Sequence, residues 1–173
     1  MSSDEDITKY ERFSNKRMLV FALYAPILNT LWALRNWIQI YAAKALGIPI
    51  LYVLLIFGIY AVWDAVNDPI TGNLLDRSSK FTERYGKRFP FIAIGVFGAL
   101  LCIILLYLPI TGDLIMIVLW LLFVVIIYDA FQTIFDLSIA GFIVDRFRDQ
   151  KQRVKLGTFT HIFAGISTLT AAV

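Results

Sequence analysis

The chain has 173 residues, of which 59% are hydrophobic and 17% charged, and its formal net charge is +3. A soluble domain of this length carries more charge and shorter apolar runs, so the composition indicates an integral membrane protein. An internal disulfide is excluded because Cys102 is the single cysteine, and its place in an apolar run makes packing its expected role.

Five apolar runs follow one another along the chain. Each is long enough to cross a bilayer, which takes about 20 apolar residues. The expected transmembrane helices cover about residues 18–42, 49–74, 89–109, 114–143 and 154–173. Short turns make the first and second helices, and the third and fourth, antiparallel neighbours. The predicted fold class is therefore an all-α membrane protein.

Basic residues gather on one side of the predicted membrane. Four lie in segment 1–17, five between the second and third runs, and five between the fourth and fifth. The positive-inside rule then makes segment 1–17 and both basic loops cytoplasmic, as expected of a multi-pass protein in the lipid of the cell membrane. Topology explains these loops, so nucleic-acid binding is not expected. The first run is too long and too polar for a cleaved signal peptide.

The fifth apolar run is still continuing at Val173, where the sequence stops. We therefore expect either a truncated longer protein or a split subunit that docks on a partner chain. Truncation is the favoured interpretation.

Acidic residues interrupt the second run at helical spacing. Asp64, Asn67 and Asp68 stand at i, i+3 and i+4 and so share one helix face. Each ionised carboxylate at the centre of a membrane helix costs roughly 2.5–3.5 kcal/mol on insertion scales. That cost indicates a face turned to a water-filled or ion-binding interior.

The fourth run carries a second polar face, formed by Asp129, Gln132, Thr133 and Asp136. The second and fourth helices both run from outside to inside, and their midpoints lie near residues 62 and 128. Asp64 and Asp129 therefore fall at nearly the same depth. We expect the two faces to converge on one cavity.

These side chains offer oxygen ligands, which suit a hard monovalent cation. The coupling ion would be sodium, with Asp64 and Asp68 as metal ligands, or a proton carried on a carboxyl group. The pattern shows no cysteine or histidine cluster for a transition metal, and no cofactor is expected. Pro69 cannot donate to the Ala65 carbonyl, which could add an oxygen ligand or allow a bend. Alternatively, the acids pair with helix caps or with Arg35 and only hold the bundle together.

Two further polar residues are candidate substrate contacts. Arg35 lies on the outer side of the first helix and could bind an anionic or hydroxylated solute bidentately. It could equally snorkel or form a structural ion pair. His161, the one histidine, lies about two turns into the fifth helix and could donate to a substrate, relay protons or simply pack.

The inner loop from 72 to 88 combines small, acidic and basic residues. Gly72 would permit close helix approach, and Asp76 would accept from a helix N-terminus or pair with a basic residue. Such a cluster can latch two helix bundles in one state and release them in the other. The predicted cytoplasmic gate consists of Gly72, Asp76, Arg77, Gly86, Lys87 and Arg88. Basic loop residues also arise from topology alone.

These gate residues resemble the inner-loop motif of the major facilitator superfamily, with a longer spacer. Within it, the segment DAVNDPITG resembles the glycoside–pentoside–hexuronide:cation symporters, the melibiose permease-like family. The resemblance implies a helix II cation site on Asp64, Asn67 and Asp68. It also implies twelve helices in two halves with the substrate between them. This chain would supply most of the N-terminal six-helix half.

The chain departs from that pattern elsewhere. By resemblance, a cation-binding threonine of helix IV corresponds to Asp129, and a sugar-binding aspartate corresponds to Gln132. An arginine of the sugar site falls on His161. A sugar-binding aspartate of helix I has no counterpart, and Asn29 is nearest. Cation coupling is thus better supported than a galactoside substrate.

The predicted function is cation-coupled symport of a small, sugar-like solute by alternating access. Asp64, Asn67, Asp68 and Asp129 would bind the cation, and Gln132, Asp136, Arg35 and His161 would be candidate substrate contacts. The alternatives are a non-transporting membrane subunit or sensor and a self-associating half-transporter. An enzyme is not expected, because no nucleophile–base pair is apparent.

Overall fold

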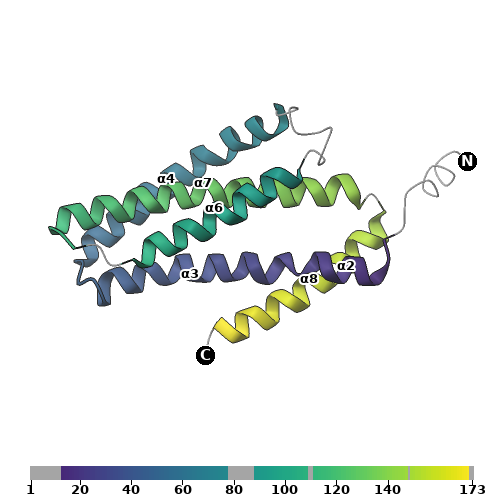
Figure 1. Ribbon diagram of the computed structural model, residues 1–173, viewed down its shortest axis with the longest axis horizontal. Helices are drawn as coiled ribbons and strands as arrows, with labels where there is room; N and C mark the ends of the chain where they lie inside the picture. Colours follow the sequence, from purple (N-terminus) through teal and green to yellow (C-terminus); the bar gives the residue numbers. More distant parts are fainter. Residues whose placement is uncertain (1–12, 78–87, 109–110, 148, 172–173) are drawn as a thin grey trace, which may run out of the picture. The chain divides into compact units, whose positions relative to one another are not determined.

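The structure is a computed structural model that describes residues 13–77, 88–108, 111–147 and 149–171, with side chains up to Thr168. Its helices are α2 (Asn15–Ala22), α3 (Tyr24–Lys44), α4 (Ile50–Arg77), α6 (Phe89–Tyr107), α7 (Leu114–Arg146) and α8 (Gln150–Ala171) (Figure 1). Every regular element in these ranges is a helix. The expected all-helical fold is confirmed.

Four stretches are long and apolar enough to cross a membrane in the part of the chain that the structure describes. They are Asn15–Lys44, Ile50–Arg77, Phe89–Tyr107 and Leu114–Arg146. The fifth expected span forms helix α8, which is not among the four. Its first turns carry Lys151, Arg153 and Lys155, which shorten its apolar run. The protein is therefore embedded in a membrane through these four stretches.

The first predicted helix is interrupted at Leu23, where α2 ends and α3 begins. Pro26 lies in the first turn of α3 and has no N–H to donate to the carbonyl of Ala22. Leu23 donates its N–H to the Val20 carbonyl instead, at 3.2 Å. The sequence prediction of one continuous helix missed this break.

Two helices extend past their predicted inner ends. α4 ends at Arg77 rather than at residue 74, and α7 ends at Arg146 rather than at 143. Each has its arginine in the last turn, where a cation interacts favourably with the exposed carbonyls. The apolar run predicts the part of each helix that lies in the membrane core, whereas α4 and α7 continue past the end of that run.

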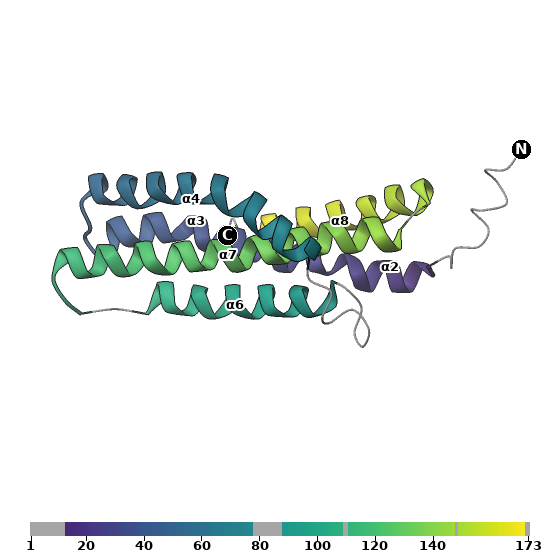
Figure 2. The ribbon, with the colours of Figure 1, turned by 90° about the horizontal axis from the view of Figure 1, so that it is seen from above.

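The chain forms two compact units. The central unit is Leu34–Phe142, and the terminal unit combines Met1–Ala33 with Ile143–Val173. In the central unit, α7 lies between α4 and α6 (Figure 2). α7 contributes the largest set of buried side chains there, with Val124, Val125 and Tyr128 almost fully covered.

Small residues bring α6 close to α7. A Cβ added at Gly95 would lie 2.7 Å from the backbone nitrogen of Phe135, so only glycine fits at this contact. At Gly98 an added Cβ would overlap the ring of Phe131. On the other side of α6, Tyr107 donates its hydroxyl to the carbonyl of Leu34 at 2.7 Å.

The terminal unit is held by contacts at the N-terminal end of α8. Phe147 is buried, and its ring centroid lies 4.9 Å from that of Phe13 and 5.7 Å from that of Phe21. Arg153 donates to the carbonyls of Phe147 and Val144 and so caps the end of α7. Lys155 donates to Asn15 Oδ1 at the start of α2, and Gln152 Oε1 accepts from the Phe13 N–H just before it.

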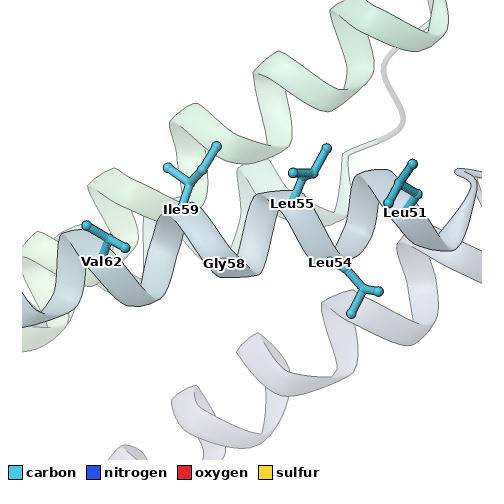
Figure 3. Close-up of a pocket in the computed structure, with 6 residues that line it drawn as sticks. All are labelled: Leu51, Leu54, Leu55, Gly58, Ile59 and Val62. Atoms are coloured by element: carbon cyan, nitrogen blue, oxygen red, sulfur yellow. The ribbon is translucent and has the colours of Figure 1, made fainter.

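The first half of α4 carries an apolar face. A shallow, open groove of about 330 Å³ runs along it (Figure 3). It is lined by Leu51, Leu54, Leu55, Gly58, Ile59 and Val62. These side chains suit contact with lipid, and the polar residues of α4 lie elsewhere on the helix.

Candidate functional site

Asn67 is the centre of a buried polar cluster between α4 and α7. Its amide Nδ2 donates to Asp129 Oδ2 and to Thr133 Oγ1, both at 3.1 Å. Its Oδ1 accepts from the Thr71 hydroxyl at 2.9 Å. Asn67, Thr71, Asp129 and Thr133 are all buried. The structure thus brings the polar faces of the two helices together at Asn67.

Thr133 extends this cluster to Asp68. Its hydroxyl accepts from Asn67 and donates to Asp68 Oδ1 at 3.1 Å. Asp68 is exposed, whereas Asp129 is 2% exposed. The Asn67 amide and the Thr133 hydroxyl therefore link the buried Asp129 carboxylate to the exposed Asp68 carboxylate.

Asp64 is half-buried one turn before Asp68 on α4. It is an electrostatic neighbour of Asp129, and so is Tyr60. Among the described residues, no three acidic, histidine or cysteine side chains converge as a metal cluster. Amide and hydroxyl oxygens of Asn67 and Thr133 lie among these carboxylates.

A second hydrogen-bonded row follows α7 towards its inner end. Tyr128 donates its hydroxyl to Gln132 Oε1, and Gln132 Nε2 donates to Asp136 Oδ1, both at 3.1 Å. Gln132 is buried and Asp136 is half-buried. Two predicted solute contacts, Gln132 and Asp136, are therefore joined to each other.

Arg35 stacks on aromatic side chains of α4. Its Cζ lies 3.9 Å from the ring centroid of Tyr60 and 5.4 Å from that of Phe57. Its Nη1 donates to Asn36 Oδ1 at 2.9 Å. No ion pair joins Arg35 to an acid in the described part of the chain. The structural ion pair considered from the sequence is thus absent there.

His161 and Asn29 belong to the terminal unit. His161 is exposed on α8. The Asn29 amide donates to the Ala164 carbonyl at 3.1 Å and to Ser167 Oγ at 3.2 Å. Asn29, the closest candidate for the sugar-binding aspartate that this chain lacks in its first helix, therefore joins α3 to α8.

The gate residues are described in part. Asp76 pairs with Arg88 across 3.3 Å, as one of its two expected roles requires. Arg77 is exposed at the end of α4. A Cβ added at Gly72 would meet only Leu137, at 3.8 Å, so close helix approach does not require this glycine. Gly86 and Lys87 lie outside the described residues.

Tyr60, Thr71 and Tyr128 join the site although the sequence analysis did not single them out. A usable signal existed, because each stands four residues from a predicted site residue: Asp64, Asn67 and Gln132 respectively. Extending the i, i+4 periodicity by one turn would have found all three.

One comparison with known proteins bears on this site. The model of the family described as MFS/sugar transport protein matches residues 22–173. No curated protein matches the chain. The match covers both polar helices, and it agrees with the broader of the two resemblances drawn from the sequence.

Proposed function

This chain belongs to the major facilitator superfamily, in the family of MFS/sugar transport proteins, and we propose that it serves cation-coupled symport of a small, sugar-like solute. Transport would follow alternating access, in which the substrate site opens to one side of the membrane at a time. The protein would lie in the cell membrane with its N-terminus in the cytoplasm.

The buried Asp129 carboxylate supports cation coupling most directly. It is 2% exposed, and the hydrogen bond that reaches it from Asn67 comes from a neutral amide. Asp129 forms no ion pair with a described residue, and a buried carboxylate outside an ion pair is costly in a low-dielectric interior. A sodium ion or a proton would remove that cost. Asp64, Asn67, Asp68 and Asp129 are accordingly our candidate cation ligands.

The solute would bind beside this cluster through oxygen-rich contacts. Arg35, Gln132, Asp136 and His161 remain the proposed contacts. Cation entry reduces the negative charge of the site, and each ligand then favours the other by the same coupling free energy. The Asp76–Arg88 pair would belong to the cytoplasmic gate.

The test is uptake of radiolabelled sugars by the full-length protein in membrane vesicles, under sodium and proton gradients applied separately. We expect one gradient to stimulate uptake. Asp64→Ala or Asp68→Ala should bring that stimulation down to the level without a gradient. Asp113→Ala is the matched control, because Asp113 is an exposed carboxylate outside the cluster. Full stimulation in both site variants would contradict the assignment.

A further inference from the structure

Arg35 is held over aromatic rings without all its donors being used. Its guanidinium carbon lies 3.9 Å above the Tyr60 ring, and Nη1 donates to Asn36. The Nε atom is buried and has no hydrogen-bond partner among the described residues. A guanidinium presents five donors in a planar fork, so Arg35 keeps donors for another group.

Tyr60 places the Arg35 guanidinium beside several acidic side chains. The Tyr60 side chain interacts with Arg35 through its ring, and it is also an electrostatic neighbour of Asp129 and Asp64. Across on α7, Tyr128 is an electrostatic neighbour of Arg35, Asp129 and Asp136. The charged neighbours that the two tyrosines have among the described residues include Arg35 and three acids, Asp64, Asp129 and Asp136, which we call the acidic cluster.

The other described cations of the central unit are engaged or placed elsewhere. Lys44 is exposed in the last turn of α3, and Arg77 is exposed in the last turn of α4. Arg88 pairs with Asp76. Among the described residues of this unit, Arg35 is therefore the positive charge beside the acidic cluster.

We infer that Arg35 is the resident counter-charge of the acidic cluster, and that the coupling cation frees its guanidinium for the solute by taking over that role. Charges attract strongly in a low-dielectric interior, and a cation–π contact is strengthened by desolvation. A cation entering among the carboxylates cancels their pull on Arg35. The released fork can then bind a pair of solute oxygens. This inference rests on the proposed function.

The inference gives a competition that can be measured without any solute. If Arg35 and the coupling cation balance the same carboxylates, removal of the Arg35 charge must strengthen cation binding. A merely structural Arg35 would give unchanged or weaker cation binding when replaced. The sign of the effect separates the two roles.

The experiment uses purified full-length protein in lipid nanodiscs, titrated with sodium at fixed pH and with protons at fixed sodium. Arg35→Met keeps an apolar stem to pack on Phe57 and Tyr60 but removes the charge. We expect it to bind the coupling cation about 5-fold or more tightly, within the usual range of coupling between sites. Arg35→Gln should shift affinity the same way. Arg35→Lys keeps the charge and should stay near wild type, as should the control Lys44→Gln.

Two contrary results have different meanings. Wild-type protein that binds neither sodium nor protons saturably contradicts the proposed function itself. If wild-type protein binds the cation and both neutral variants bind it no more tightly, only the role of Arg35 is overturned. Arg35→Met and Arg35→Gln are two independent neutral replacements, so misfolding of one leaves the other as the test.

Discussion

Asn67 in the central unit and Asn29 in the terminal unit make nearly the same connection with different partners. Each amide nitrogen donates two hydrogen bonds to a neighbouring helix, at 3.1–3.2 Å. The acceptors of Asn29 are a backbone carbonyl and a hydroxyl, at Ala164 and Ser167. Those of Asn67 are the Asp129 carboxylate and the Thr133 hydroxyl.

The difference shows what turns a helix-joining amide into part of a binding site. An asparagine that donates to backbone carbonyls and hydroxyls holds two membrane helices together and leaves no charge to be balanced. An asparagine that donates to a buried carboxylate orients a charged group that no ion pair neutralises. Asn67 and its partners therefore carry the functional proposal, and Asn29 does not.

The largest expected difference comes from truncating the two asparagines in turn. Asn67→Ala removes a proposed sodium ligand and the hydrogen bond that positions Asp129, so sodium affinity should fall roughly 10-fold or more. Proton binding should instead become tighter, because the lost donor favours the ionised carboxylate. Asn29→Ala removes interhelical bonds that average about 0.6 kcal/mol each in membranes, and cation affinity should be unchanged. Equilibrium cation binding and thermal unfolding measure the two effects. Equal cation affinities in the two variants would abolish the distinction.

A somewhat smaller contrast is expected between glycines of the two units. Gly95→Ala would press a methyl group onto the backbone of Phe135, and such overpacking typically destabilises by about 1–3 kcal/mol. Gly157 on α8 has nothing within 4 Å of an added Cβ, so Gly157→Ala should be neutral or slightly stabilising through helix propensity. Thermal unfolding in detergent compares them. A destabilised Gly157→Ala beside an unaffected Gly95→Ala would contradict the close packing of α6 on α7.

Periodicity predicted which residues share a helix face, and depth predicted which faces could meet. These two arguments were enough to group Asp64, Asn67 and Asp68 and to set Asp129 opposite them. They could not identify Asn67 as the central donor, because hydrogen-bond direction depends on how two helices are rotated against each other. The partner of Arg35 was equally hidden, since aromatic residues make up 15% of the chain and no spacing singles out Tyr60.

Contacts between helices also explain the remaining misses. Gly95 gives no sequence signal, because its role depends on Phe135 lying against it from another helix. The break at Leu23 was readable in principle, since Pro26 removes the donor for the Ala22 carbonyl. Gly72 was predicted to permit close helix approach, and an added Cβ there would make only an ordinary contact with Leu137. Features that depend on neighbouring residues in the sequence, such as the break at Leu23, were therefore predictable. Contacts that depend on another helix, such as Gly95 against Phe135, were not.

The smallest effect is expected at the C-terminal end of α4, where Asp76 pairs with Arg88. Asp76 and Arg88 lie 3.3 Å apart, but the Asp76 side chain is 70% exposed, so solvent screens the pair. Exposed ion pairs contribute about 1 kcal/mol at most. Asp76→Asn should therefore lower the free energy of unfolding by no more than about 1 kcal/mol, and the loss should shrink at high salt. Asp113→Asn is the control, because it neutralises an exposed carboxylate outside the proposed gate.

The outcome of this last comparison separates a static from a dynamic role for the pair. A loss well above 1 kcal/mol would mean that Asp76 is desolvated in the resting protein, contrary to its exposure. A small loss of stability combined with a clear fall in uptake rate would place the contribution of the pair in the conformational change, as a gate requires. Identical behaviour of Asp76→Asn and Asp113→Asn in both measurements would remove the pair from the proposed gate. An exposed ion pair such as Asp76–Arg88 would then have no role in transport, in contrast to the role proposed for the buried Asn67–Asp129 contact.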